Sequence, residues 1–208
     1  MNKYIMELIG TFFLVLTIGC TVIGAHEKVI PALAIASILM AMVFAGGHIS
    51  GGHYNPAVTL AVWIRGRCET KDVVPYWVAQ IIGAAAAAGV VTMLRAGVAV
   101  TPMIPDVGPA LIAEFIFTFA LAFVVISTAT VKSTAGNSFY GLAIGFTVLA
   151  GAFSVGNISG GALNPAVAIG ISAMGLVGWG SLWIYLVANL LGGAAAGIVF
   201  KSLNPDDK

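Results

Sequence analysis

Residues 47–58 read Gly-His-Ile-Ser-Gly-Gly-His-Tyr-Asn-Pro-Ala-Val, and residues 156–167 read Gly-Asn-Ile-Ser-Gly-Gly-Ala-Leu-Asn-Pro-Ala-Val. The two stretches lie 109 positions apart and are identical at nine of twelve positions, which chance does not produce in a chain of 208 residues. Asparagine before proline disfavours helix, whereas proline fits the first helical turn. We therefore predict that Asn55 and Asn164 each cap a short helix whose positive dipole end is free.

The repetition extends over most of the chain. Residues 7–12 resemble residues 114–119 at an offset of 107, and both segments begin with glutamate. Further matches follow each motif at an offset of 109: Tyr76, Gln80, Gly83 and Ala85 in the first half, and Tyr185, Asn189, Gly192 and Ala194 in the second. Residues 1–95 and 109–201 are thus two versions of one unit, and the proline-containing linker at 96–108 should be irregular. Because neither half can cover its own motif loop, we expect a single domain over residues 1–208.

The composition is that of a membrane protein. Hydrophobic residues make up 60% of the chain and charged residues 8%, which lies outside the range of soluble domains. A bilayer span needs about 20 apolar residues. Six segments are long enough, at 4–24, 29–47, 74–94, 109–130, 138–155 and 181–200, whereas those at 55–64 and 164–173 are too short. The predicted fold class is therefore an all-α integral membrane protein with six transmembrane helices and two re-entrant half-helices.

The topology follows from the number of spans in each half. Three spans is an odd number, so the halves must enter the membrane from opposite sides, and their motifs should meet near the bilayer midplane. Seven cations fall on one side of this topology and two on the other. The seven are Lys3, Arg65, Arg67, Lys71, Lys132, Lys201 and Lys208, and the two are Lys28 and Arg95. The excess predicts that both termini are cytoplasmic.

Several functional classes have no support in the sequence. The net charge of +1 gives no reason to expect nucleic-acid binding. We find no nucleophile–base pair, metal-ligand cluster or phosphate-binding loop, so we expect no enzyme activity, metal or cofactor. Cys20 and Cys68 lie in an apolar run and an arginine-rich loop, and we do not expect a disulfide. His26 should lie in an exposed turn.

These features resemble the aquaporin, or major intrinsic protein, family over nearly the whole chain. One Asn-Pro-Ala motif is a weak signal, but two at matching places in an inverted repeat are very specific. The resemblance implies a homotetramer with one pore per subunit and passive conduction of water or small neutral solutes. The short terminal segments and the lack of organelle-targeting features favour the cell membrane.

The motifs predict the centre of the pore. Non-helical backbone at membrane depth is tolerated where it lines a cavity or is buried in protein. The two loops should therefore present a ladder of carbonyl acceptors, with the asparagine amides as donors at the midpoint. The predicted backbone lining is Gly51, Gly52, His53, Tyr54, Gly160, Gly161, Ala162 and Leu163, and the motif residues are Asn55, Pro56, Ala57, Asn164, Pro165 and Ala166. Two half-helix N-termini should make the centre electropositive and oppose cations and protons.

Other polar residues have predicted supporting roles. Glu7 and Glu114 are intramembrane carboxylates, which are costly. Each should accept hydrogen bonds from loop N–H groups or else be protonated. Gln80 and Asn189 occupy equivalent positions and should tie spans to loops. His48 could gate the cytoplasmic mouth by protonation, whereas His53 could brace the loop.

The chain departs from most of the family at the residue after the second motif. That residue is commonly arginine and forms the narrowest constriction, but here it is Val167. The family's spacing places Ile35, Ala152 and Gly161 beside it. This predicts a wide, apolar, uncharged filter, which partly resembles that of plant vacuolar intrinsic proteins.

Ammonia, urea, hydrogen peroxide and glycerol then become candidate solutes, although an apolar ring can also hold water back by dewetting. The competing hypotheses are a strictly water-selective pore, a secondary transporter and a closed structural membrane protein.

Overall fold

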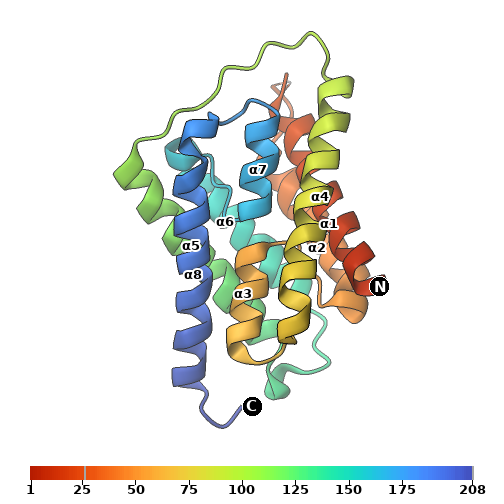
Figure 1. Cartoon of the computed structure of the whole chain (residues 1–208), viewed down its shortest axis with the longest axis vertical. Coiled ribbons are helices and arrows are strands. Elements are labelled where there is room, and N and C mark those ends of the chain that lie inside the picture. Colours follow the sequence, from red (N-terminus) through yellow and green to blue (C-terminus); the bar gives the residue numbers. More distant parts are fainter. Residues whose placement is uncertain (26, 208) are drawn as a thin grey trace.

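The computed structural model describes residues 1–25 and 27–207, so the predictions for His26 and Lys208 fall outside the described residues. The described chain is helical (Figure 1). The helices are α1 (Asn2–Val22), α2 (Pro31–Ser50), α3 (Pro56–Arg65), α4 (Thr70–Leu94), α5 (Val107–Ala129), α6 (Tyr140–Ser159), α7 (Pro165–Ala173) and α8 (Leu182–Leu203), with 3-10 turns at Lys132–Thr134 and Trp179–Ser181.

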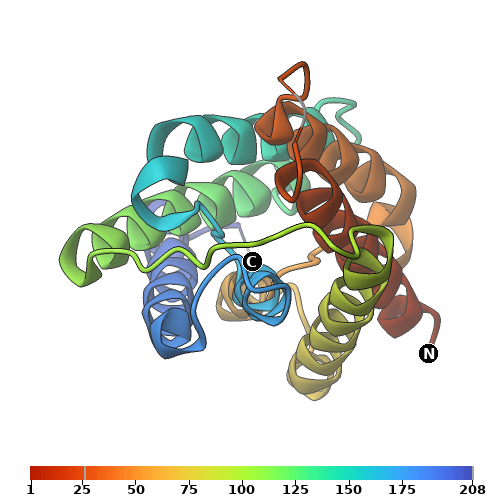
Figure 2. The same ribbon diagram turned by 90° about the horizontal axis from the view of Figure 1, so that it is seen from above.

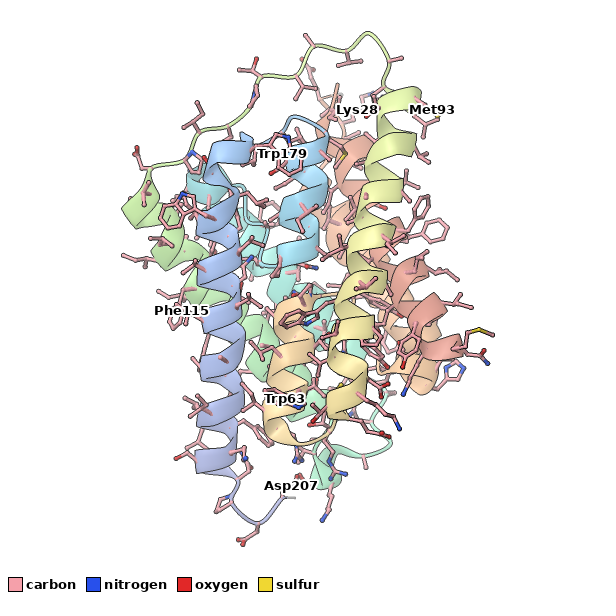
Figure 3. The ribbon with its side chains drawn as sticks, in the orientation of Figure 1. Lys28, Trp63, Met93, Phe115, Trp179 and Asp207 are labelled. Atoms are coloured by element: carbon pink, nitrogen blue, oxygen red, sulfur yellow. The ribbon has the colours of Figure 1, made fainter. Side chains whose placement is uncertain are left out.

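The predicted fold class is confirmed. Within the described residues, six helices are long and apolar enough to cross a membrane: α1, α2, α4, α5, α6 and α8. The short helices α3 and α7 lie one below the other in the middle of the molecule (Figure 1). Viewed from above, they overlap and lie between α4 and α8, toward one side of the molecule (Figure 2). Phe115 and Trp63 point outward (Figure 3), as expected of a surface that faces lipid.

Two helices run further than the sequence predicts. α2 and α6 continue to Ser50 and Ser159, so the first part of each repeated motif is helical rather than loop. In an apolar environment every backbone hydrogen bond is valuable, and glycine tolerates helix. The helices end only at Gly51 and Gly160, which have φ angles of +88° and +86° and close the final turns. Glycine is favoured there because it adopts the left-handed conformation without strain.

The two halves share the same internal packing. α1 packs against α2 and α4 in the first half, and α5 packs against α6 and α8 in the second. Small residues allow the closest approaches: a Cβ on Gly83 of α4 would lie 2.4 Å from the Leu8 carbonyl oxygen, and one on Gly192 of α8 would lie 2.6 Å from that of Phe115. Each half-helix packs against the other half of the chain: α3 packs mainly on α8, and α7 packs mainly on α4. Each half therefore completes the other.

The two ends of the molecule differ. We call the end near Asp207 the terminal side and the opposite end, near Lys28, Met93 and Trp179, the linker side (Figure 3). Residues 95–106 connect α4 to α5 and cross above α7 on the linker side (Figure 2). Met103 attaches this segment, because its N–H donates to the Leu176 carbonyl at 2.9 Å and its carbonyl accepts from the Gly178 N–H at 3.2 Å.

Candidate pore

The two asparagines of the repeated motif hold the half-helices together. The Oδ1 atom of Asn55 accepts from the N–H groups of Ala57 and Val58 at 2.8 and 3.4 Å, which caps α3. Asn164 caps α7 in the same way, through Ala166 and Val167 at 2.9 and 3.4 Å. The amide nitrogens reach across. Asn55 Nδ2 donates to the Leu163 carbonyl and Asn164 Nδ2 to the Tyr54 carbonyl, both at 2.8 Å.

Each re-entrant loop rests on one fully buried glutamate. Glu7 accepts hydrogen bonds from the N–H groups of His53 and Tyr54, at 2.9 and 2.6 Å, and from the hydroxyl of Ser50 at 2.7 Å. Gln80 Nε2 adds a fourth bond at 2.8 Å. Four donors around one carboxyl satisfy the acceptor capacity of a buried carboxylate.

Glu114 repeats the arrangement in the second half. It accepts from Ala162 N–H at 2.9 Å, Leu163 N–H at 2.7 Å and the Ser159 hydroxyl at 2.7 Å. Asn189, the mate of Gln80, also lies within hydrogen-bonding reach of Glu114, and its Oδ1 atom accepts from the Thr118 hydroxyl at 3.0 Å. The two amides are therefore equivalent in position and both lie beside a glutamate, but Gln80 contacts Thr59 whereas Asn189 contacts Thr118.

Sequence reasoning missed two further pairs of supporting residues. Ser50 and Ser159 bind the glutamates, although both serines stand inside the quoted repeat. The hydroxyls of Tyr76 and Tyr185 donate to the carbonyls of Ser50 and Ser159 at 2.8 and 2.5 Å. The signal was present, because both pairs are identical in the two halves at an offset of 109.

A narrow cavity passes the asparagines. This central cavity has a volume of about 100 Å³. Its wall largely repeats between the halves, since the pairs Leu14 and Leu121, Ile18 and Val125, Ile35 and Ile144, Leu39 and Val148, and Val58 and Val167 all line it. Asn55 and Asn164 line it too. The apolar pairs contributed by α1 and α5 were not predicted from the sequence.

Comparisons with known proteins agree with this geometry. A family model described as "Major intrinsic protein" matches residues 1–200. The chain belongs to the major intrinsic protein family. Aquaporin NIP1-3 of Oryza sativa subsp. japonica is 37% identical over 219 residues, covering 100% of this chain and 75% of that protein. Aquaporin Z of Rhodopseudomonas palustris is 33% identical over 229 residues, covering 99% and 94%.

A solved structure shares the fold. The aquaglyceroporin from Plasmodium falciparum superposes with a TM-score of 0.82 at 21% identity, covering 98% of this chain and 97% of that one. The chain is therefore a multi-pass membrane protein of a channel family. Its named relatives are channels rather than enzymes.

The structure gathers the four residues that the family's spacing selects as the filter. Ile35, Ala152, Gly161 and Val167 all line the central cavity. A Cβ on Gly161 would lie 3.5 Å from the Cα of Ala152, so the loop and α6 are in close contact there. No charged side chain from the described residues lines this cavity.

The other predicted lining residues divide between two cavities. Gly52, His53, Tyr54, Gly160, Ala162 and Leu163 line the central cavity, whereas Gly51 lines a second cavity on the terminal side. The motif prolines and alanines line neither cavity and form the first turns of the half-helices. His48, the predicted gate, lies exposed on the last turn of α2 and lines neither cavity.

The second cavity, which we call the terminal cavity, is larger and has charged residues in its lining. Its volume is about 550 Å³, and its lining includes Lys3, Arg67, Lys132, Glu69 and Asp72. Lys3 and Asp72 form an ion pair at 2.5 Å. Cys68 lines the same cavity, and both cysteines are free thiols. On this side, a larger cavity with charged residues in its lining thus adjoins the mainly apolar central cavity.

Proposed function

We propose that this protein conducts water and small neutral solutes passively through the central cavity. We also propose that it works as a homotetramer in the cell membrane, with both termini cytoplasmic. The observation that carries the proposal is the reciprocal pairing of the two asparagine amides across the meeting point of α3 and α7. That pairing fixes two helix N-termini, each with its amide donors, beside a narrow uncharged conduit.

The centre of this conduit suits a neutral solute. The N-termini of α3 and α7 carry partial positive charge, which opposes cations and protons. One amide hydrogen of each asparagine is committed to the opposite loop, which leaves the second hydrogen for a solute. Gly52, Gly161 and their neighbours bring loop backbone to the same wall. A molecule with lone pairs and no charge can exchange hydrogen bonds along this path.

The apolar filter favours more than one solute. Val167 takes the place of the arginine that most of the family carries, so the ring with Ile35, Ala152 and Gly161 lacks a fixed charge and its donors. Ammonia, urea, hydrogen peroxide and glycerol are the solutes we propose beside water. A strictly water-selective pore is the competing hypothesis.

A secondary transporter and a closed structural protein fit the geometry less well. A secondary transporter needs groups that bind a coupling ion, but the intramembrane carboxylates Glu7 and Glu114 are fully buried and already hold the loops. A closed structural protein has no use for the amide donors that line the conduit. Flux that saturates or follows a pH gradient would favour a transporter.

The test is stopped-flow light scattering of proteoliposomes mixed with urea or glycerol. Initial shrinkage reports water flux and later reswelling reports solute flux. We expect both phases to be faster than in protein-free liposomes, and we expect Val167→Arg to slow reswelling more than shrinkage. Fast shrinkage with no added reswelling would mean a water-selective pore. Reswelling that Val167→Arg leaves unchanged would remove Val167 from the constriction.

A further inference from the structure

The central and terminal cavities meet at two residues. His53, in the first re-entrant loop, lines both cavities, and so does Val125 on α5. The four filter residues around Val167 all lie within the central cavity instead. The boundary at which the central cavity ends and the terminal cavity begins therefore lies on the terminal side of Asn55 and Asn164.

We propose that the narrowest section of the conduit lies between His53 and Val125, and that this section, rather than the ring around Val167, sets the largest solute that passes. This inference rests on the proposed function and identifies where in the path its solute selection occurs. His53 also supplies the polar contact of the section, because this residue is 8% exposed and lines both cavities.

The two-fold repeat supports this placement. The ring around Val167 has an image on the terminal side, in which Val58, Gly52 and Ile144 replace Val167, Gly161 and Ile35. The fourth position of the ring is Ala152 in the second half and the larger Val43 in the first half. Val43 lies 3.4 Å from a Cβ built on Gly52, where Ala152 lies 3.5 Å from one built on Gly161.

The neighbouring loop position is also larger on the terminal side. His53 stands where the second half has Ala162. Val43 is buried and lines neither cavity, so the larger lining side chain on the terminal side is the ring of His53, which stands where the second half has a methyl group. The symmetry of the fold would give two equal sections, and the His53 ring narrows the one on the terminal side.

Hydrogen bonds fix the His53 ring in this position. Its Nδ1 atom lies 3.1 Å from the hydroxyl of Thr59, which donates its own hydrogen to the Asn55 carbonyl at 3.1 Å. Gln80 Nε2 also donates to this hydroxyl, at 3.0 Å. Because the hydroxyl has a single hydrogen, Nδ1 must be the donor to Thr59, and in the neutral ring Nε2 is then an acceptor.

The free ring nitrogen gives the section its chemistry. Nε2 has no hydrogen-bond partner in residues 1–25 and 27–207, while Val125 faces the same junction with an apolar side chain. The section thus combines one acceptor with one apolar wall. It should pass small neutral molecules that donate a hydrogen bond and exclude those too wide to fit beside the ring.

The experiment compares equivalent residues in the two halves. Val125→Ala removes the wall beside His53, and Ile18→Ala makes the same kind of change at the repeat mate of Val125 on α1. His53→Ala gives the terminal side the residue that the second half already has. Each variant is reconstituted as full-length protein, and the permeability to glycerol is divided by the permeability to water from the same stopped-flow traces. Size-exclusion chromatography and circular dichroism check that each variant is folded.

We expect Val125→Ala and His53→Ala each to raise the glycerol-to-water ratio about threefold or more, and Ile18→Ala to raise it less. A ratio that rises with Ile18→Ala or Ile35→Ala but not with the two terminal-side variants would overturn the inference and return the limit to the ring around Val167. If Val125→Ala does not fold, His53→Ala decides alone. Wild-type vesicles that shrink no faster than protein-free ones would overturn the proposed function and this inference with it.

Discussion

At the scale of single residues, the two re-entrant loops pack against their helices with side chains of different size. Tyr54 and Leu163 are equivalent, and both have a φ angle of +50°, which is uncommon for residues other than glycine. The Tyr54 ring lies against Gly10 and Gly46, whereas the second half has Phe117 and Val155 at those positions. The large Tyr54 side chain thus lies against glycines, whereas the second half has the smaller Leu163 and larger residues at the equivalent helix positions.

Gly10→Ala should therefore destabilise the protein. A Cβ at Gly10 would lie 2.1 Å from Tyr54 Cε1, and the ring is held by a bond of 2.9 Å from its hydroxyl to the Met42 carbonyl. Overpacking of this kind costs about 1–3 kcal/mol. Gly89→Ala, where no atom lies within 4 Å, is the matched control and should be neutral or stabilising. The midpoint of thermal unfolding in detergent measures the stability of both variants. Adding Tyr54→Leu to Gly10→Ala should restore part of the stability that Gly10→Ala loses.

Residue-scale contacts were only partly predictable from the sequence. The Asn-Pro pairs identify the helix caps, because proline restricts the backbone on both sides of the bond. The cross-loop bonds from Asn55 to Leu163 and from Asn164 to Tyr54 join residues more than 100 positions apart, and no local pattern encodes them. The tautomer of His53 is likewise set by a second contact, the hydrogen bond from the Thr59 hydroxyl to the Asn55 carbonyl.

At the scale of elements, each re-entrant loop depends on a long helix that presents one carboxylate. Glu7→Gln should destabilise the first loop. In the wild type, the loop N–H groups donate to two carboxylate oxygens, whereas the glutamine amide has only one oxygen that can accept. At least one loop N–H would lose its acceptor, at a cost of about 1–3 kcal/mol. Glu27→Gln is the control, since this glutamate is exposed and lines neither cavity.

The midpoint of thermal unfolding and the water permeability should both fall for Glu7→Gln, and both should stay near the wild-type values for Glu27→Gln. If Glu7→Gln matched the wild type in both measurements, Glu7 would not support the loop.

Most elements could be predicted from hydropathy and the repeat, but their ends could not. The six spans are visible as apolar runs, and α3 and α7 as short runs after proline. The extension of α2 and α6 through Gly47 and Gly156 was missed because glycine usually signals a helix end. Here the following serines are needed in helix, where they reach Glu7 and Glu114.

At the scale of the whole molecule, the segment after α8 returns to the body of the protein. Asp207 accepts from Arg65 Nη2 at 2.8 Å and from the Lys132 N–H at 3.1 Å, and its carbonyl accepts from Arg65 Nη1 at 2.8 Å. The Arg65 side chain is 1% exposed and lies over the Phe200 ring. This contact joins the end of α3 to α5 and α8.

The contact should weaken in acid. Desolvation acts to raise the pKa of the Asp207 carboxyl, but the hydrogen bonds from Arg65 and Lys132 outweigh it and leave the pKa below its ordinary value. A lowered folded-state pKa means that the stabilisation is complete above the ordinary pKa and is lost as pH falls through the lowered one.

Asp207→Asn should therefore lower the thermal midpoint at neutral pH, and the difference from wild type should shrink in acid. Asp206→Asn, one residue away and exposed, is the control. A difference that is constant across pH would show that the carboxylate charge is not what holds this segment.

The inverted repeat also predicts the overall plan. An odd number of spans in each half forces inversion, and inversion brings the motifs together. What the sequence does not encode locally is the crossing of α3 onto α8 and of α7 onto α4, because it depends on which small residues face each other across the halves. Gly193, for example, leaves room for the Ala57 carbonyl, 2.3 Å from a built Cβ.

Osmotic shrinkage of proteoliposomes in an impermeant osmolyte such as sucrose tests the central claim most directly, namely that water crosses through the central cavity. Wild-type protein should shrink the vesicles faster than protein-free controls, and Ala152→Trp, which fills the cavity from α6, should return the rate to the control value while the circular dichroism spectrum is unchanged. A wild-type rate equal to the control, or a folded Ala152→Trp variant as fast as the wild type, would contradict the account.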